Sequence, residues 1–217
     1  MFASGRGGHY DLYQKNANGT GEDELLLKSD QDKIPTSWSR DGRFLLFTSS
    51  DPKTQNDIWV LPLEGDRKPV PFLRTESIAR EGSFSPDGRW VAYTSFESGR
   101  FEVYVRPFSL PGAAGSSSAG GKWQISKAGA RAPLWRGDSK ELFYLADDRL
   151  RVMAVEVAAN PAFQAGIPQP LFNVPPNATA PQVTADGKRF LIAAPPQQAN
   201  VELPITVLLN WPALLKK

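Results

Sequence analysis

The chain alternates short apolar runs with polar connections rich in glycine and proline. Four of the apolar runs cover residues 44–48, 90–94, 141–145 and 190–193, and each is too short for an ordinary helix. The 19 prolines and 18 glycines are spread between the runs rather than collected in one tail. Many short strands joined by turns produce such a pattern. It therefore predicts an all-β protein.

The apolar runs belong to an internal repeat, which narrows the choice of fold. Residues 38–49, Trp-Ser-Arg-Asp-Gly-Arg-Phe-Leu-Leu-Phe-Thr-Ser, recur at 84–95 as Phe-Ser-Pro-Asp-Gly-Arg-Trp-Val-Ala-Tyr-Thr-Ser, an offset of 46 residues. Partial copies begin at residues 135 and 183, after further offsets of 51 and 48 residues. A second shared element of β-forming residues occurs at 11–13, 57–60, 102–105 and 150–153. Five complete or partial units are therefore visible.

The centre of the repeat predicts a tight hairpin turn. Glycine takes positive φ without a steric clash, and Asp accepts hydrogen bonds from neighbouring amides. The residues assigned to these turns are Asp41, Gly42, Asp87, Gly88, Asp138, Asp186 and Gly187. Ser139 stands where glycine is expected, so we expect a different type of turn there. The large residues before the turns, Trp38, Phe84 and Trp135, are expected to form structural core between neighbouring sheets.

Period and motif together resemble the WD40-like repeat of the TolB propeller family, often called PD40. Residues 83–95 match its W-S-P-D-G-[KR] pattern and the strand after it nearly throughout, whereas Arg40 replaces the proline in the copy at 38–49. The resemblance implies a β-propeller of four-stranded antiparallel blades. We expect one domain over 1–217, an incomplete arc of about four to five blades. The expected blades are 1–30 (partial), 31–75, 76–127, 128–173 and 174–217 (partial).

The number of strands predicts that the propeller continues before Met1, although a closed ring of five blades stays open as an alternative. Free strand edges at the ends of an arc would favour self-association. Residues 204–217 resemble the end of bacterial multidomain proteins in which a Ser/Thr kinase or a winged-helix domain precedes such a propeller. The sequence does not assign a cellular compartment. One expectation is a periplasmic or other extracytoplasmic location, as part of a longer bacterial chain.

Composition mainly excludes functions. The formal net charge is only +2 and no basic block occurs, so no nucleic-acid partner is predicted. No apolar run is long enough to cross a bilayer, so no membrane segment is predicted in this chain. Cysteine is absent, and the glycine-rich stretch 112–121 lacks the order of a phosphate-binding loop and reads as a flexible excursion. We therefore predict no metal site and no cofactor.

Catalytic motifs are similarly weak. His9 is the only histidine, and with Asp11 and Asn16 it matches the spacing of a kinase catalytic loop. No D-F-G sequence follows, and the repeat already assigns Asp11 to a strand. The spacing is therefore attributed to chance.

The sequence favours a non-catalytic module that binds a protein or peptide partner. Loops that enter the first strand of each blade line the funnel mouth in related propellers, and here they carry Lys33, Arg80, Glu81 and Arg131. A basic funnel mouth would favour an acidic partner. Two alternatives stay open: an enzyme of glycosidase or lyase type with a carboxylate-based site in the funnel, and a sensor domain of a receptor-like Ser/Thr kinase.

Overall fold

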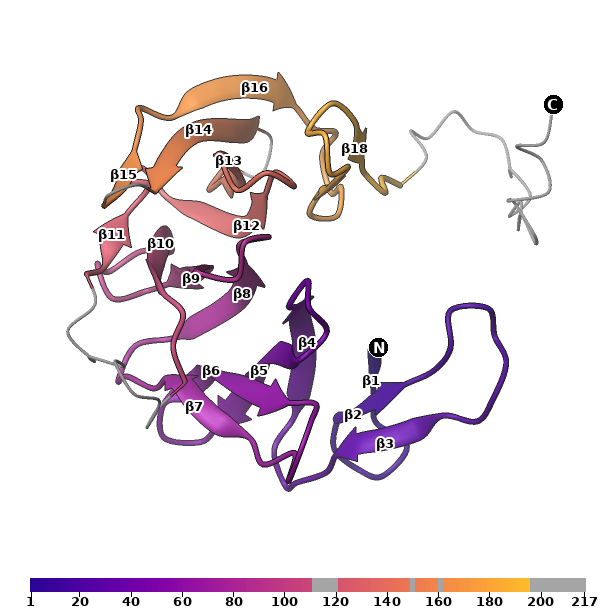
Figure 1. Ribbon diagram of the computed structural model, residues 1–217. Coiled ribbons are helices and arrows are strands. Elements are labelled where there is room, and N and C mark those ends of the chain that lie inside the picture. Colours follow the sequence, from indigo (N-terminus) through magenta and orange to yellow (C-terminus); the bar gives the residue numbers. More distant parts are fainter. Residues whose placement is uncertain (111–120, 149–150, 160–161, 196–217) are drawn as a thin grey trace, which may run out of the picture.

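The computed structural model describes the chain except for residues 111–120, 149–150, 160–161 and 196–217. The predicted excursion at 112–121 and the segment 204–217 thus lie almost wholly outside the described residues. The part that is described consists of strands and connecting turns, without a helix. The strands form successive antiparallel sheets around a common centre (Figure 1).

Strands that are neighbours in the sequence pair within each sheet, except that the last strand of the fourth sheet, β16, pairs with β14. We call each sheet a blade. Blade 1 contains β1 (Phe2–Ser4), β2 (Asp11–Gln14) and β3 (Glu24–Leu27). Blade 2 contains β4 (Lys33–Trp38), β5 (Phe44–Asp51), β6 (Gln55–Pro62) and β7 (Val70–Leu73). Blade 3 contains β8 (Ala79–Phe84), β9 (Trp90–Ser95), β10 (Glu102–Pro107) and β11 (Trp123–Gln124). Blade 4 contains β12 (Ala130–Trp135), β13 (Glu141–Ala146), β14 (Arg151–Ala159), β15 (Phe163–Ala165) and β16 (Gln169–Asn173), and blade 5 contains β17 (Gln182–Val183) and β18 (Phe190–Leu191).

The blades radiate from the centre. Strands β4, β8 and β12 lie innermost, while β7, β11 and β16 lie at the outside of their blades (Figure 1). The arc is open between blade 1 and blade 5 (Figure 1). This arrangement confirms the predicted all-β propeller with four-stranded antiparallel blades.

Apolar side chains fill the space between consecutive blades. Leu12 of blade 1 packs with Leu45, Phe47 and Leu61 of blade 2, and all four are at most 2% exposed. Further clusters join blades 2 and 3, blades 3 and 4, and blades 4 and 5. Full burial of one such side chain contributes roughly 1.5–3 kcal/mol before the entropy of ordering it is subtracted. The stacking of repeats therefore supplies the core.

The repeated turn owes its shape to its serine and aspartate. Ser39 donates from its hydroxyl to Asp41 at 2.7 Å, and the same carboxylate accepts from the backbone N–H of Arg43 at 3.1 Å. Gly42 closes the turn with φ of 78° and donates its N–H to the Ser39 carbonyl at 2.9 Å. The motif thus specifies a type I turn followed by a left-handed residue.

The expectation of a different turn at Ser139 is wrong. Ser139 adopts φ of 62° and donates its N–H to the carbonyl of Arg136 at 2.9 Å, the same bond that Gly42 makes in its own turn. The left-handed conformation costs a non-glycine residue roughly 1–2 kcal/mol. The Ser139 hydroxyl offsets part of this cost, because it accepts from the backbone N–H of Asp87 in blade 3 at 3.1 Å.

The expectation that Trp38 forms structural core is also wrong. Phe84 and Trp135 are 6% and 7% exposed, whereas Trp38 is 47% exposed. Trp135 packs across the interface and donates from its indole N–H to the carbonyl of Ser83 in β8, the innermost strand of the preceding blade. Among the described residues blade 1 has no strand that corresponds to β8, since β1 aligns in the repeat with β5 and β9. Trp38 therefore donates to Gly42 in its own turn.

Candidate partner-binding rim

The second residues of β8 and β12, rather than the loops before them, place two equivalent arginines on one face of the propeller. Arg80 and Arg131 each lie just before a shift in strand register, and the residues that follow them, Glu81 and Ala132, have φ of 58° and 52°. Such bulges turn a strand and re-aim its side chains. We call this face, where the innermost strands begin, the upper rim.

Arg80 and Arg131 share one aromatic ring. The guanidinium carbon of each lies 4.3 Å from the ring centroid of Phe101, which precedes β10 in blade 3. Their side chains are only 27% and 20% exposed, and the Nε atom of each guanidinium is buried. Cation–π contacts of this kind contribute roughly 0.5–2 kcal/mol each, more where water is excluded. The two charges are therefore held in place rather than free to move with solvent.

Glu81 joins the two blades below the arginines. Its carboxylate accepts from the hydroxyl of Thr94 at 2.7 Å and from the backbone N–H of Ala132, in the next blade, at 2.9 Å. The second carboxylate oxygen lies 3.9 Å from Nε of Arg80. These bonds fix the register of the two bulges, so the structure gives Glu81 a positioning role.

Lys33 does not belong to this surface, and the prediction that it contacts a partner is wrong. Its side chain is 1% exposed and its ammonium group lies 3.0 Å from Asp11 in blade 1. It also donates to the carbonyls of Ser29 and Gln31. Burial raises the pKa of Asp11, but the hydrogen bonds from Lys33 and from the Ser29 amide outweigh this effect and lower it. The ion pair between Lys33 and Asp11 thus links blade 2 to blade 1.

Buried carboxylates at the start of the third strand were missed by the sequence reasoning. Asp11 and Glu102 open β2 and β10, Asp57 is the third residue of β6, and all three are at most 1% exposed. Glu102 accepts from the hydroxyl of Ser126 and, at 2.9 Å, from the N–H of Gly129, which leads into the next blade. An acid recurs at the first position of the second shared element, and that recurrence was the available signal. These acids organise loops between blades.

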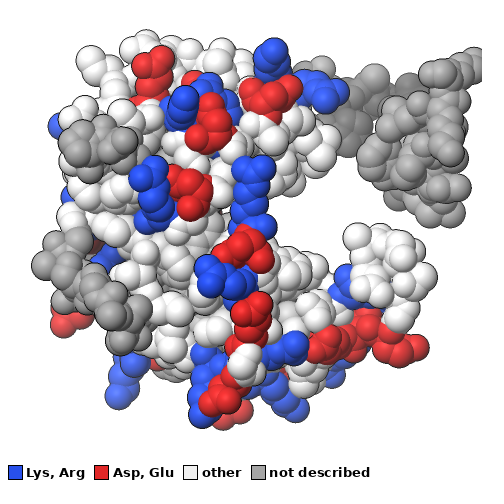
Figure 2. Space-filling model, in the orientation of Figure 1, with Lys and Arg blue, Asp and Glu red and all other residues white. Residues whose placement is uncertain are grey.

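The charges on the face drawn in Figure 2 are mixed. Lys and Arg alternate with Asp and Glu, without a broad area of one sign (Figure 2). Within the described ranges no helix is long and apolar enough to span a membrane. In the same part of the chain, no three His, Cys, Asp or Glu side chains gather as a metal site would require.

Comparison with solved structures identifies the type of fold. No protein-family model matches the chain, and a search of curated proteins found no match. A TolB protein of Agrobacterium tumefaciens is 18% identical with a TM-score of 0.62, over 78% of this chain and 58% of its own. TolB of Acinetobacter baumannii is 19% identical with a TM-score of 0.66, over 87% of this chain and 44% of its own. A periplasmic gluconolactonase of Pseudomonas aeruginosa is 20% identical with a TM-score of 0.50, over 84% of this chain and 56% of its own.

At these identities the matches establish architecture. The chain is a β-propeller with the TolB type of fold, as its repeated motif predicted. It spans 58% and 44% of the length of the two TolB chains, so what a whole propeller of this type does is a matter for proposal.

Proposed function

We propose that the chain is a non-catalytic binding module whose upper rim receives an acidic segment of a protein partner. The observation that supports this proposal is the shared stacking of Arg80 and Arg131 on Phe101, with each guanidinium carbon 4.3 Å from the ring centroid. A guanidinium presents several N–H donors in a planar fork that fits a carboxylate.

The stacking also reduces the entropic cost of binding. A free arginine side chain loses roughly 1.5–2 kcal/mol of rotamer entropy when it is fixed, and here part of that loss has occurred during folding. Glu81 adds to the same effect, because its bond to Ala132 holds the two bulges in register. Arginines that are fixed before the partner arrives should bind it more tightly than ordinary surface arginines, whose contacts are transient.

An enzymatic funnel is the competing proposal, since a gluconolactonase is among the structures of similar fold. A general acid at neutral pH needs a raised pKa. Among the described residues, eight carboxylates have clearly lowered pKa values, which favours the binding proposal. They are Asp11, Asp23, Glu24, Asp41, Asp51, Asp87, Asp138 and Asp186.

The test uses an acetylated, fluorescein-labelled hexaglutamate peptide at low ionic strength, with hexaglutamine as the uncharged counterpart. Fluorescence anisotropy should show that the double variant Arg80→Gln and Arg131→Gln binds hexaglutamate at least tenfold more weakly than the unmodified chain. Glutamine lacks the guanidinium that stacks on Phe101, so the melting temperature should fall, and binding is measured well below the melting temperature of both chains.

A matched control removes the same net charge on the opposite face, through Lys68→Gln and Lys188→Gln. Both lysines are exposed; Lys68 lies in the loop between β6 and β7, and Lys188 lies in the turn between β17 and β18. The control should bind as the unmodified chain does. Equal weakening by the two double variants would show that net charge, rather than the rim, attracts the peptide, and would reject the proposal.

A further inference from the structure

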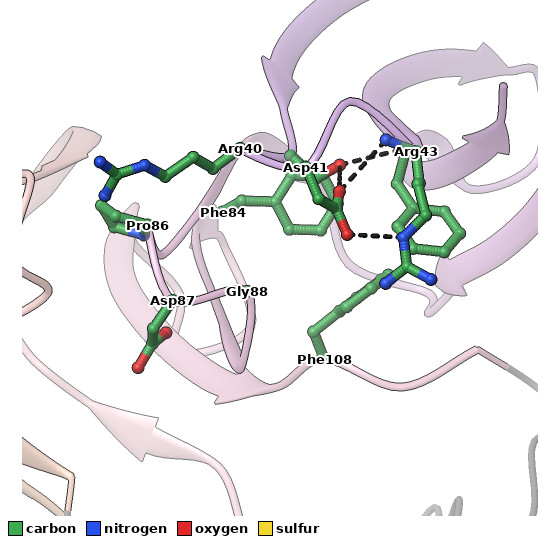
Figure 3. Close-up of a pocket in the computed structure, with 10 residues that line it drawn as sticks. Arg40, Asp41, Arg43, Phe84, Pro86, Asp87, Gly88 and Phe108 are labelled. Carbon is green, nitrogen blue, oxygen red and sulfur yellow. Dashed lines mark hydrogen bonds and ion pairs between the residues drawn. The ribbon is translucent and has the colours of Figure 1, made fainter.

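A pocket lies on the face opposite the upper rim, between the hairpin turns of blades 2 and 3. It has a volume of about 390 Å³ and is bordered by the turns at 39–43 and 86–88 and by Phe108, which follows β10 (Figure 3). Since Arg80 is the second residue of β8 and Phe84 is the last, roughly 13 Å of extended strand separates this pocket from the upper rim. We call it the turn pocket.

Three phenyl rings form the apolar lining of the turn pocket. Phe108 meets Phe44 at a centroid distance of 5.4 Å and Phe84 at 4.8 Å, with interplanar angles of 64° and 82°. Edge-to-face rings of this kind leave edges and faces that can receive a further aromatic ring. The volume lies at the lower end of the range for ligand pockets and suits a single side chain.

The next interface along the arc carries a larger ring at the equivalent repeat position. Trp90 occupies the repeat position of Phe44, two residues after the turn glycine. Its indole packs 5.4 Å from the ring of Trp123 and 5.0 Å from the ring of Phe163. The pocket therefore lies where the repeat has the smaller ring of Phe44. The larger ring of Trp90 makes aromatic contacts of its own.

The edge of the turn pocket carries one guanidinium that no carboxylate of the described residues neutralises. Arg43 pairs with Asp41 at 2.6 Å, within its own turn. Arg40 is exposed, and in the part of the chain that is described it forms no ion pair. Its one hydrogen bond goes to the carbonyl of Gly137 at 3.3 Å, which leaves most of its N–H donors available. Arg40 also departs from the repeat, which has Pro86 at this position in blade 3.

We propose that the turn pocket binds an acidic peptide segment of a partner protein, in which an aromatic residue stands beside a glutamate. The aromatic ring enters among Phe44, Phe84 and Phe108, and the glutamate carboxylate accepts from Arg40. Charge complementarity supports the acid, and the phenyl lining supports the ring. This site is independent of the upper rim and of the function proposed for it.

The probe is the acetylated and amidated hexapeptide Gly-Ser-Phe-Glu-Gly-Ser. Titrated to millimolar concentration into the ¹⁵N-labelled 217-residue chain, it should cause saturable shifts of the Gly88 and Phe108 amides. Peptides with glutamine for glutamate, or alanine for phenylalanine, should bind at least fivefold more weakly. Absence of saturable shifts, or equal binding of the glutamine peptide, would overturn the proposal.

Two variants take their new residue from the neighbouring repeat, which favours correct folding. Phe44→Trp copies Trp90 and should weaken binding at least tenfold by occupying the pocket. Arg40→Pro copies Pro86 and should abolish the preference for glutamate over glutamine. Arg80→Gln, on the upper rim, should leave the titration unchanged. Unaltered binding by either of the first two variants, each with a native-like spectrum, would overturn the proposal, and so would a loss with Arg80→Gln.

Discussion

The interfaces on the two sides of the arc use the same repeat position in opposite ways. Between blades 3 and 4, Trp135 is 7% exposed and its indole N–H reaches the Ser83 carbonyl. Between blades 1 and 2, Trp38 is 47% exposed and bonds only within its own turn. A motif residue thus becomes core only where the preceding blade supplies the strand that covers it.

A second repeat position, at the start of the innermost strand, also differs between these two interfaces. The residue that opens the innermost strand is Ala130 in blade 4, fully buried among apolar side chains. In blade 2 it is Lys33, which pairs with Asp11 across the interface. The interface between blades 1 and 2 thus combines a half-exposed tryptophan with a buried ion pair, and the interface between blades 3 and 4 uses apolar burial at both positions.

The largest predicted effect comes from removing the buried tryptophan. Trp135→Ala should lower the free energy of unfolding by about 3–5 kcal/mol, because it opens a cavity and leaves the Ser83 carbonyl unbonded. Trp38→Ala should cost about 1 kcal/mol, since much of that ring already contacts water. Urea unfolding followed by circular dichroism measures both. Equal losses would contradict the contrast between the two interfaces.

The buried ion pair should give the next largest effect. Lys33→Met keeps the volume but leaves the Asp11 carboxylate buried without its cation, which should cost about 3 kcal/mol in the same measurement. Adding Asp11→Asn removes the orphaned charge and should recover more than half of the loss. If the double variant were as unstable as Lys33→Met alone, packing rather than charge would hold this interface together.

Much of the architecture could be predicted because it is encoded locally. The hairpin turn depends on residues within five positions of one another, as the bonds among Ser39, Asp41 and Arg43 show. The repeat of such turns then implies the propeller. The precise blade boundaries stay predictions.

Burial and site geometry depend on distant segments, and there the predictions were weaker. The exposure of Trp38 and the burial of Lys33 are both set by blade 1, whose contribution does not appear in the repeat around either residue. The stacking on Phe101 joins residues 80, 101 and 131, so no local pattern could reveal it. The acid that recurs at Asp11, Asp57 and Glu102 is present in the sequence, but the loop that each one bonds is set by the fold.

The smallest predicted effect is a change in the pH dependence of stability, and it should be equal for the hairpin turns of blades 2 and 4. The hydroxyl of Ser39 and the side chain of Arg43 lower the pKa of Asp41 to about 2, and the side chain of Arg136 lowers the pKa of Asp138 to about 2. Both values lie below the usual 3.8, so each ionised carboxylate stabilises the fold above about pH 4. This contribution is lost as the pH falls from about 4 to about 2, because protonation removes the acceptor that holds the turn.

Asp41→Asn and Asp138→Asn separate the turns from the other acids. Each variant should show a shallower fall of the urea midpoint between pH 4 and pH 2 than the unmodified chain, and the two reductions should match. Such a match would mean that the turn is stabilised within itself, whether the tryptophan before it is covered or exposed. A change confined to Asp138→Asn would instead show that the carboxylate acts through the packed interface, because only there does the turn lie beside a fully covered ring.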